Sequence, residues 1–126
     1  DELKLVHAFL KDDYFLLMSP NDYNTLGVGT TQLYNTLIVY NHKRHGEFKL
    51  GSKTYSFRLK HRFPKQSTPE FLLVDLVNNM SSLAEDSALV MKHVLKKIKS
   101  LDSKKINQAV NDFGNVRTKA LMAPFI

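Results

Sequence analysis

The 126-residue chain contains no cysteine and no long apolar run. The lack of cysteine excludes disulfides and thiolate zinc sites, and it fits a reducing cytoplasm. The longest apolar runs, residues 15–18 and 37–40, are far shorter than the ~20 residues that a membrane-spanning helix needs. We therefore expect a cytoplasmic protein without a membrane segment. Because the chain opens on Asp1, with neither a Met nor a signal peptide, we also expect it to be a fragment of a longer protein.

Motifs of catalysis and cofactor binding are missing as well. The chain has no Walker motif, no nucleophile elbow and no zinc-protease helix, and Gly27-x-Gly29 lacks the third glycine of a dinucleotide site. His42 and His45 are close in sequence, but no carboxylate is spaced to complete the three or four ligands of a zinc site. The two cationic residues between them would also repel a metal ion. We therefore expect a binding protein rather than an enzyme, with no cofactor and no metal.

Positive charge is what the chain has in excess, with a formal net charge of +6. It is concentrated in two blocks. Residues 42–65 hold eight Lys or Arg and one Glu, and residues 92–105 hold six Lys and one Asp, whereas residues 1–41 and 66–91 are acidic. Two basic blocks in an otherwise acidic chain predict a surface that faces a polyanion. For the second block, the alternative is an ordinary solvated helix face.

The spacing of apolar residues changes between residues 64 and 69. Before this break, a first helix over residues 2–11 is followed by segments with the period of two that is typical of strands. After it, apolar residues recur with helical spacing. The predicted strands are Tyr14–Met18, Thr36–Tyr40, Glu47–Leu50 and Lys53–Lys60. The predicted helices are a short one from Ser19 to Gly27, one over residues 69–80, one over residues 85–99, one from Ser103 to Gly114, and one from Asn115 onward. Thr68 and Ser103 are predicted as caps, and Pro69 is predicted at the first helical position after Thr68.

These elements predict an α+β fold that forms a single domain over residues 1–126. Gly51 and Ser52 separate two alternating segments, which is typical of a hairpin. The sheet of three to four strands is therefore expected to be mostly antiparallel and to run as a meander. We expect it to pack with the N-terminal helix and with the C-terminal helical half, against the helices over 69–80 and 85–99.

The most distinctive segment is the loop over residues 40–46, in which cationic side chains follow a tyrosine and precede a glycine. A second cationic cluster, made of Arg58, Lys60 and Arg62, lies at the end of the last predicted strand. A meander would bring the two together, so we expect one positively charged face that binds DNA phosphates in a salt-dependent and largely non-specific manner. A solvated hairpin loop is the alternative. The candidate contact residues here are Lys43, Arg44, His45, Lys49, Arg58, Lys60 and Arg62.

The segment from Leu37 to Lys60, LIVYNHKRHGEFKLGSKTYSFRLK, resembles the C-terminal domain of AbiEi-type antitoxins. These belong to the bacterial abortive-infection, type IV toxin–antitoxin systems. Residues 113–121, FGNVRTKAL, are similar to the closing Tyr/Phe-Gly-Asn-x-Arg-Thr-Lys-x-Leu pattern of that family. Residues 19–28 resemble its short helix before the sheet, and the likeness spans roughly Leu3 to Ile126. A winged-helix domain normally precedes this one in the family, and it is missing from the chain.

The resemblance implies an antitoxin that also represses its own operon. The domain would neutralise a nucleotidyltransferase-like toxin, assist operator DNA binding through its basic face, or do both. Its partners would be the cognate toxin and operator DNA. The alternative is a protein-interaction domain whose basic face binds an acidic partner, with no direct nucleic-acid role. A small enzyme acting on an anionic substrate is a third class, which nothing in the residue spacing predicts.

The last predicted helix begins at Asn115, whose side chain can cap it. Arg117 is open to two interpretations. It either forms an ion pair with Asp112 or Asp75 that orders the start of the helix, or it contacts toxin or DNA together with Asn115 and Lys119. The residues of this segment that we expect to face the core are Val116, Ala120, Leu121, Met122 and Phe125.

Overall fold

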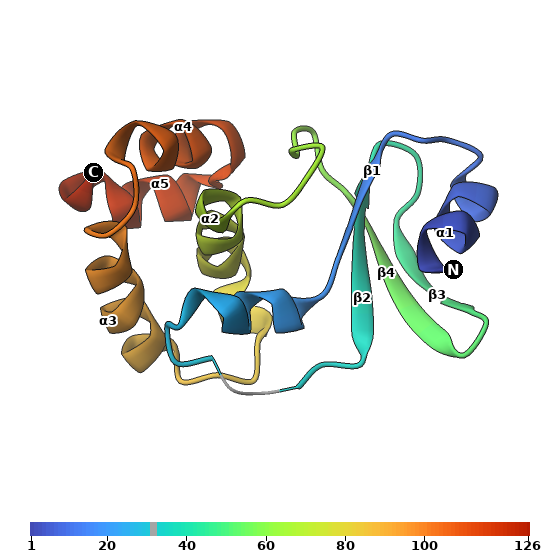
Figure 1. Cartoon of the computed structure of the whole chain (residues 1–126), viewed down its shortest axis with the longest axis horizontal. Helices are drawn as coiled ribbons and strands as arrows, with labels where there is room; N and C mark the ends of the chain where they lie inside the picture. Colours follow the sequence, from blue (N-terminus) through green and yellow to red (C-terminus); the bar gives the residue numbers. More distant parts are fainter. Residues whose placement is uncertain (31–32) are drawn as a thin grey trace. The chain divides into compact units, whose positions relative to one another are not determined.

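The computed structural model describes residues 1–30 and 33–126, which fall into two compact units (Figure 1). The sheet unit holds residues 1–20 and 33–67, and the helical unit holds the described residues of 21–30 and 68–126. Together they confirm the α+β class. That residues 1–126 act as a single domain, with the sheet packed against helices of the second half, stays a prediction.

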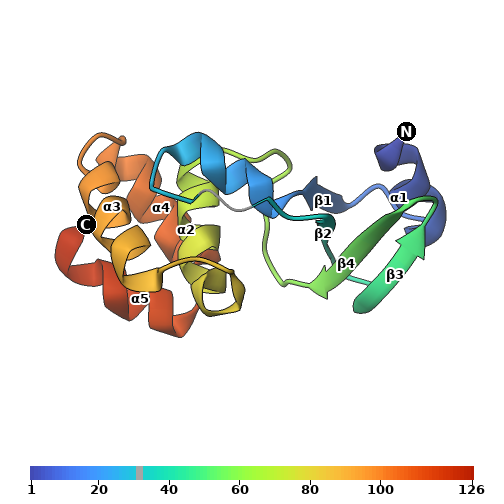
Figure 2. The ribbon, with the colours of Figure 1, turned by 90° about the horizontal axis from the view of Figure 1, so that it is seen from below.

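The sheet unit contains four strands in the order β1-β2-β4-β3. The two outer pairs, β1 with β2 and β3 with β4, are antiparallel, whereas β2 and β4 are parallel. The sheet is therefore mostly antiparallel, as predicted, but the meander is wrong. The chain leaves β2, forms β3 at the outer edge and returns as β4 between them (Figure 2). The strands are β1 Phe15–Met18, β2 Thr36–Asn41, β3 Gly46–Leu50 and β4 Lys53–Leu59.

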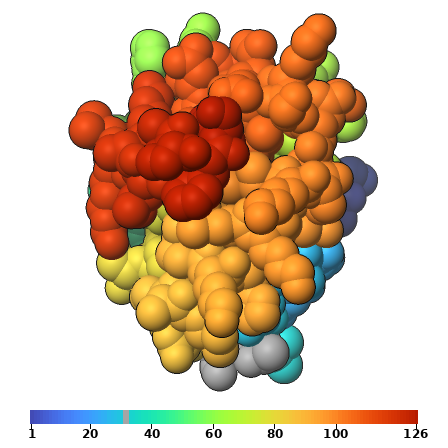
Figure 3. All heavy atoms as spheres, turned by 90° about the vertical axis from the view of Figure 1, so that its left-hand side faces the viewer, coloured from blue at the N-terminus to red at the C-terminus, as the bar shows by residue number. Residues whose placement is uncertain are grey.

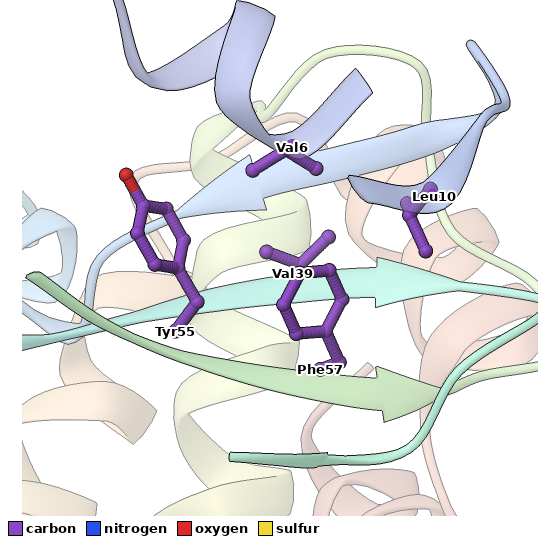
Figure 4. Packing of buried hydrophobic residues seen from close by; sticks show 5 residues of the cluster. All are labelled: Val6, Leu10, Val39, Tyr55 and Phe57. Carbon is purple, nitrogen blue, oxygen red and sulfur yellow. The ribbon is translucent and has the colours of Figure 1, made fainter. Parts of the chain in front are cut away.

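Helix α1, Glu2–Leu10, covers one face of this sheet. Asp1 caps its start by accepting a hydrogen bond from the Lys4 amide at 2.8 Å, and Lys11 ends it in a left-handed conformation. Its buried side chains meet those that alternate on one side of β2 and β4, as Figure 4 shows. This apolar cluster consists of Val6, Leu10, Val39, Tyr55 and Phe57.

The helical unit is built around α2, Pro69–Asn79, whose residues 71–77 are all buried. Thr68 caps α2 through the Phe71 amide at 3.1 Å and Pro69 takes the first turn, as predicted. The predicted short helix is the 3-10 helix η1, Pro20–Leu26. The other elements are η2 Met80–Ser82, α3 Ser87–Ile98, α4 Ser103–Phe113, α5 Val116–Met122 and η3 Ala123–Phe125.

Two predictions at helix starts and faces in this unit are corrected. The cap of α4 is Asp102 rather than Ser103, because the Asp102 carboxylate accepts hydrogen bonds from the amides of the next turn at 2.9 and 3.2 Å. On α5 the buried residues are Thr118 and Met122. Of the residues predicted to face the core only Met122 is buried, and the exposed ones are Val116, Ala120, Leu121 and Phe125.

Across residues 1–30 and 33–126, no helix combines the length and the apolar character that crossing a bilayer requires.

Candidate nucleic-acid interface

Three segments meet at the end of the sheet where β2 and β4 finish and β1 begins. Phe15 pairs with Asn41, and Asn41 pairs with Leu59, so the residues just beyond these positions leave the sheet side by side. A backbone bond from the Lys60 amide to the Asn41 carbonyl, 3.2 Å, extends this pairing. These segments carry a group of cationic residues that we call the basic end: Lys43, Arg44, His45, Lys60, Arg62 and Lys65.

The prediction of one positively charged face is corrected, because the basic end surrounds one end of the sheet. The Arg44 guanidinium lies 5.1 Å from the centre of the Phe9 ring, on the face that α1 covers. The Lys60 ammonium lies 5.4 Å from the centre of the Tyr40 ring, on the opposite face. Successive strand residues point to opposite sides of a sheet. The basic end therefore presents Arg44 on one side of the sheet and Lys60 on the other. Cation–π contacts hold each of the two in place.

Asn41 orders the loop that carries Lys43, Arg44 and His45. Its side chain is buried, and its amide nitrogen donates to the carbonyls of Val39 at 3.0 Å and Arg44 at 3.1 Å. Its carbonyl oxygen accepts from the amides of Lys43 at 2.8 Å and Arg44 at 2.7 Å. Asparagine commonly closes turns in this way by bonding the backbone two residues on. One side chain therefore fixes the crossover from β2 to the sheet edge.

Lys43 is held in place from the neighbouring helix. Its ammonium donates to the Leu10 carbonyl at 2.9 Å, at the carboxyl end of α1. A cation is favourable there because the last carbonyls of a helix have no partner within the helix and carry partial negative charge. His45, in contrast, is an exposed loop residue. The loop thus presents cations whose positions are largely set before any ligand arrives.

One predicted contact residue of the sheet unit, Lys49, lies apart from the basic end, whereas Arg58 adjoins it two residues before Lys60. Lys49 pairs with Thr54 near the hairpin turn, about 20 Å along β4 from Lys60 at the strand's rise per residue. Arg58 is half-buried and donates from Nε to the Ser56 hydroxyl at 3.2 Å.

At the hairpin between β3 and β4, a hydrogen bond and an ion pair with Glu2 raise the pKa of Lys53. Burial raises the pKa of the Tyr55 hydroxyl on the same strand.

An aromatic cluster that the sequence did not reveal adjoins the basic end, made of Tyr14, His42 and Phe63. The rings of Tyr14 and His42 stack with centres 5.0 Å apart, and Phe63 lies 5.1 Å from each. The His42 ring contacts the His61 carbonyl through Nε2 at 3.0 Å. Only the strand register unites these three positions, so no local pattern could have shown them. Over the described ranges, no three His, Asp or Glu side chains gather as metal ligands.

The remaining predicted residues, Asn115, Arg117 and Lys119, lie in the helical unit. The Asn115 side chain accepts from the Thr118 amide at 2.8 Å, so it caps α5 as predicted. Its own amide donates to Asn78 of α2 at 3.0 Å. Arg117 and Lys119 are exposed. Figure 3 shows the surface of this unit, where the red C-terminal segment adjoins the orange segment that contains α4.

Both carboxylates proposed for Arg117 accept hydrogen bonds from other side chains. Asp75 is buried and accepts from the Tyr23 hydroxyl, and Asp112 accepts from the Gln108 side chain at 3.0 Å. Lys119 lines an open groove of about 720 Å³ together with Lys104 and polar residues of α4. Asn115 thus has a structural role as the cap of α5, and a partner contact of Arg117 and Lys119 stays a prediction.

Gly114→Ala is expected to destabilise the helical unit by about 1–3 kcal/mol, as overpacking does. A Cβ at this position would stand 2.6 Å from the Val110 carbonyl oxygen, which belongs to the backbone of α4 and already accepts the Gly114 amide. Thermal unfolding measures the effect. The control is Arg117→Ala, three residues away and exposed, which should leave the melting temperature unchanged. Equal melting temperatures for Gly114→Ala and the parent chain would show that the turn between α4 and α5 tolerates a Cβ beside the Val110 carbonyl, contrary to this prediction.

No family model, curated protein or solved structure matches the chain.

Proposed function

We propose that this chain is a cytoplasmic, non-enzymatic regulator domain of the antitoxin type, which contacts the phosphate backbone of operator DNA through its basic end. The observation that carries the proposal is the convergence of Lys43, Arg44 and Lys60 with their cationic neighbours, through the register of three strands. Phosphate contacts position a protein on DNA and supply affinity without reading sequence. The neutralisation of a nucleotidyltransferase-like toxin rests on the family resemblance, with Arg117 and Lys119 as its candidate contacts.

The order of the loop supports this role. Lysine and arginine side chains lose rotamer freedom when they bind, and a cation already held by Leu10 or by an aromatic ring has less to lose. If, for example, four cations of the basic end each contact a phosphate, the affinity for duplex DNA should fall about 100-fold between 50 and 200 mM salt. A steep salt dependence with little sequence preference is therefore the signature that we expect.

The test uses Arg62→Gln with Lys65→Gln, because both residues are exposed at the basic end and both lie outside the loop over residues 42–45. The matched control is Lys4→Gln with Lys49→Gln, which removes the same charge from exposed positions of the same unit, outside the basic end. Fluorescence anisotropy with a duplex from the chain's own promoter region, at 50 and 200 mM salt, should show weaker binding for the first pair. The slope of log affinity against log salt should fall by about 1.8.

Two results would overturn the proposal. If both double variants lose affinity equally, the positive charge acts without a localised site. If the chain ignores duplex DNA yet binds an acidic polypeptide such as polyglutamate with the same salt dependence, the basic end binds an acidic protein partner instead.

A further inference from the structure

Tyr14 presents an aromatic ring to solvent on a fixed backing. It is 57% exposed and directly precedes β1. The ring lies against His42 and Phe63, and Phe63 is only 8% exposed. His42 is in turn tied to the backbone of the segment after β4. The exposed ring is therefore a rigid platform rather than a mobile side chain.

A small hollow of about 170 Å³ lies beside this platform, lined by Asp13, Tyr14, Phe15, Phe63 and Lys65. Sites that enclose whole drug-sized ligands measure roughly 300–1,000 Å³. The hollow is therefore suited to one planar ring system, with the rest of the ligand outside it. Its lining combines aromatic surface with one carboxylate and one ammonium group.

The charges around the hollow decide what kind of planar group it takes. The Asp13 carboxylate lies 2.6 Å from His7 Nδ1, and because its side chain is 93% exposed, water and salt screen its charge. The neighbouring Asp12 carboxylate accepts a hydrogen bond from the Tyr14 amide at 3.1 Å. The other charged side chain of the lining is Lys65, and the rest of the basic end adds further positive charge. An aromatic or alkylated cation would meet this repulsion, whereas a ring that carries a phosphate would be attracted. Nucleotides have this combination of a planar base and an anionic phosphate.

We infer that the hollow binds one unpaired nucleobase, stacked on Tyr14, with an adjoining phosphate held by Lys65 and its cationic neighbours. This inference rests on the proposed function and deepens it, from contact with a phosphate backbone to capture of a base that is out of its pair. Aromatic side chains beside a cationic groove bind single-stranded nucleic acids in this way, and every base has a π-face that can stack. The same chemistry would accept a base within a strand or a free nucleotide.

The experiment compares three fluorescent DNA probes of about 12 nucleotides, within the ~4–16 nucleotides that single-strand sites span. They are a thymidine oligomer, an abasic oligomer with the same phosphates, and a duplex. The parent chain should bind the thymidine oligomer roughly 5- to 150-fold more tightly than the abasic oligomer. This comparison needs no variant, so it holds whatever a substitution does to folding.

Variants then assign the effect to the platform. Tyr14→Ala should remove the preference for the thymidine oligomer, and Tyr14→Phe should keep it, because the ring and not the hydroxyl stacks. The matched control is Phe125→Ala, which removes an aromatic ring that is 51% exposed in the helical unit and should change nothing. Competition by thymidine monophosphate separates the two sources. Displacement of the probe at micromolar nucleotide assigns the site to a free nucleotide, and its absence assigns it to a base within a strand.

The outcomes separate this inference from the proposed function. Equal affinity for the thymidine and abasic oligomers, with salt-dependent binding to the duplex, would overturn the stacking site and leave the backbone contact standing. A preference for the thymidine oligomer that survives Tyr14→Ala would also overturn it. Failure to bind any of the three probes would remove both.

Discussion

Replacing Phe57 by alanine should lower the free energy of unfolding of the sheet unit by about 3–5 kcal/mol, the range for truncating a buried aromatic side chain. Phe57 is fully buried on β4, with its ring centre 4.9 Å from that of Phe9 and 5.7 Å from that of Phe48. These rings join α1 to the sheet and to its edge strand. Figure 4 shows Phe57 beside Val6 and Leu10 of α1. Truncation leaves a cavity at the point where the three elements meet.

The same substitution should weaken DNA binding although Phe57 is buried. Phe9 carries the guanidinium of Arg44, and the last turn of α1 holds Lys43. A loosened α1 therefore releases both cations from their set positions. Hydrogen exchange of residues 1–20 and 33–67, measured by mass spectrometry, reports stability for this unit alone.

The control for this prediction is Leu59→Ala, on the same strand and the same side but 56% exposed. Its effect should stay within about 0.5 kcal/mol. If the two truncations change hydrogen exchange by the same amount, the cluster around Phe57 is not what holds α1 to the sheet.

Local patterns predicted the elements well, because each depends on nearby residues. Alternation in β4 placed Tyr55 and Phe57 on one face, and both are buried under α1. Thr68 followed by Pro69 marked the start of α2, since a side-chain oxygen and a preset φ satisfy the first turn whatever the tertiary fold. Asn115 marked α5 for the same reason.

Strand order could not be predicted in this way. A period of two shows which face a residue occupies but not which strand lies beside it, so a meander and the observed order bury the same residues of β4. The buried side chain of Asn41 closes the loop through which the chain leaves β2 for the sheet edge. In the sequence, this asparagine resembles any polar residue next to a basic loop.

The candidate site was predicted in part for the same physical reason. Lys43 and Arg44 are adjacent in sequence, so their charge is visible as a block. Lys49 was grouped with them by sequence distance, yet the hairpin carries it to the other end of the strand. Tyr14 and Phe63 come from distant segments and meet only through strand pairing.

Tyr23→Phe should destabilise the helical unit by about 1.5–3 kcal/mol, the value of a hydrogen bond to a charged group. The Tyr23 hydroxyl donates to the Asp75 carboxylate at 2.5 Å, and both side chains are 1% exposed. The Asn79 side chain contacts the same two oxygens at 3.2 and 3.3 Å. Removing the hydroxyl takes a donor from a carboxylate that water cannot reach, at a place where η1 is joined to α2.

The matched control is Tyr14→Phe, which deletes the same hydroxyl from an exposed ring and should leave stability within about 0.5 kcal/mol. Hydrogen exchange of residues 69–79 measures the loss in α2, where Asp75 lies in the middle of the buried run. Unchanged protection in Tyr23→Phe would mean that the carboxylate is satisfied without the Tyr23 hydroxyl. In that case the segment of η1 is held to α2 by the packing of the Tyr23 ring, and Tyr23→Leu should then be the more damaging substitution.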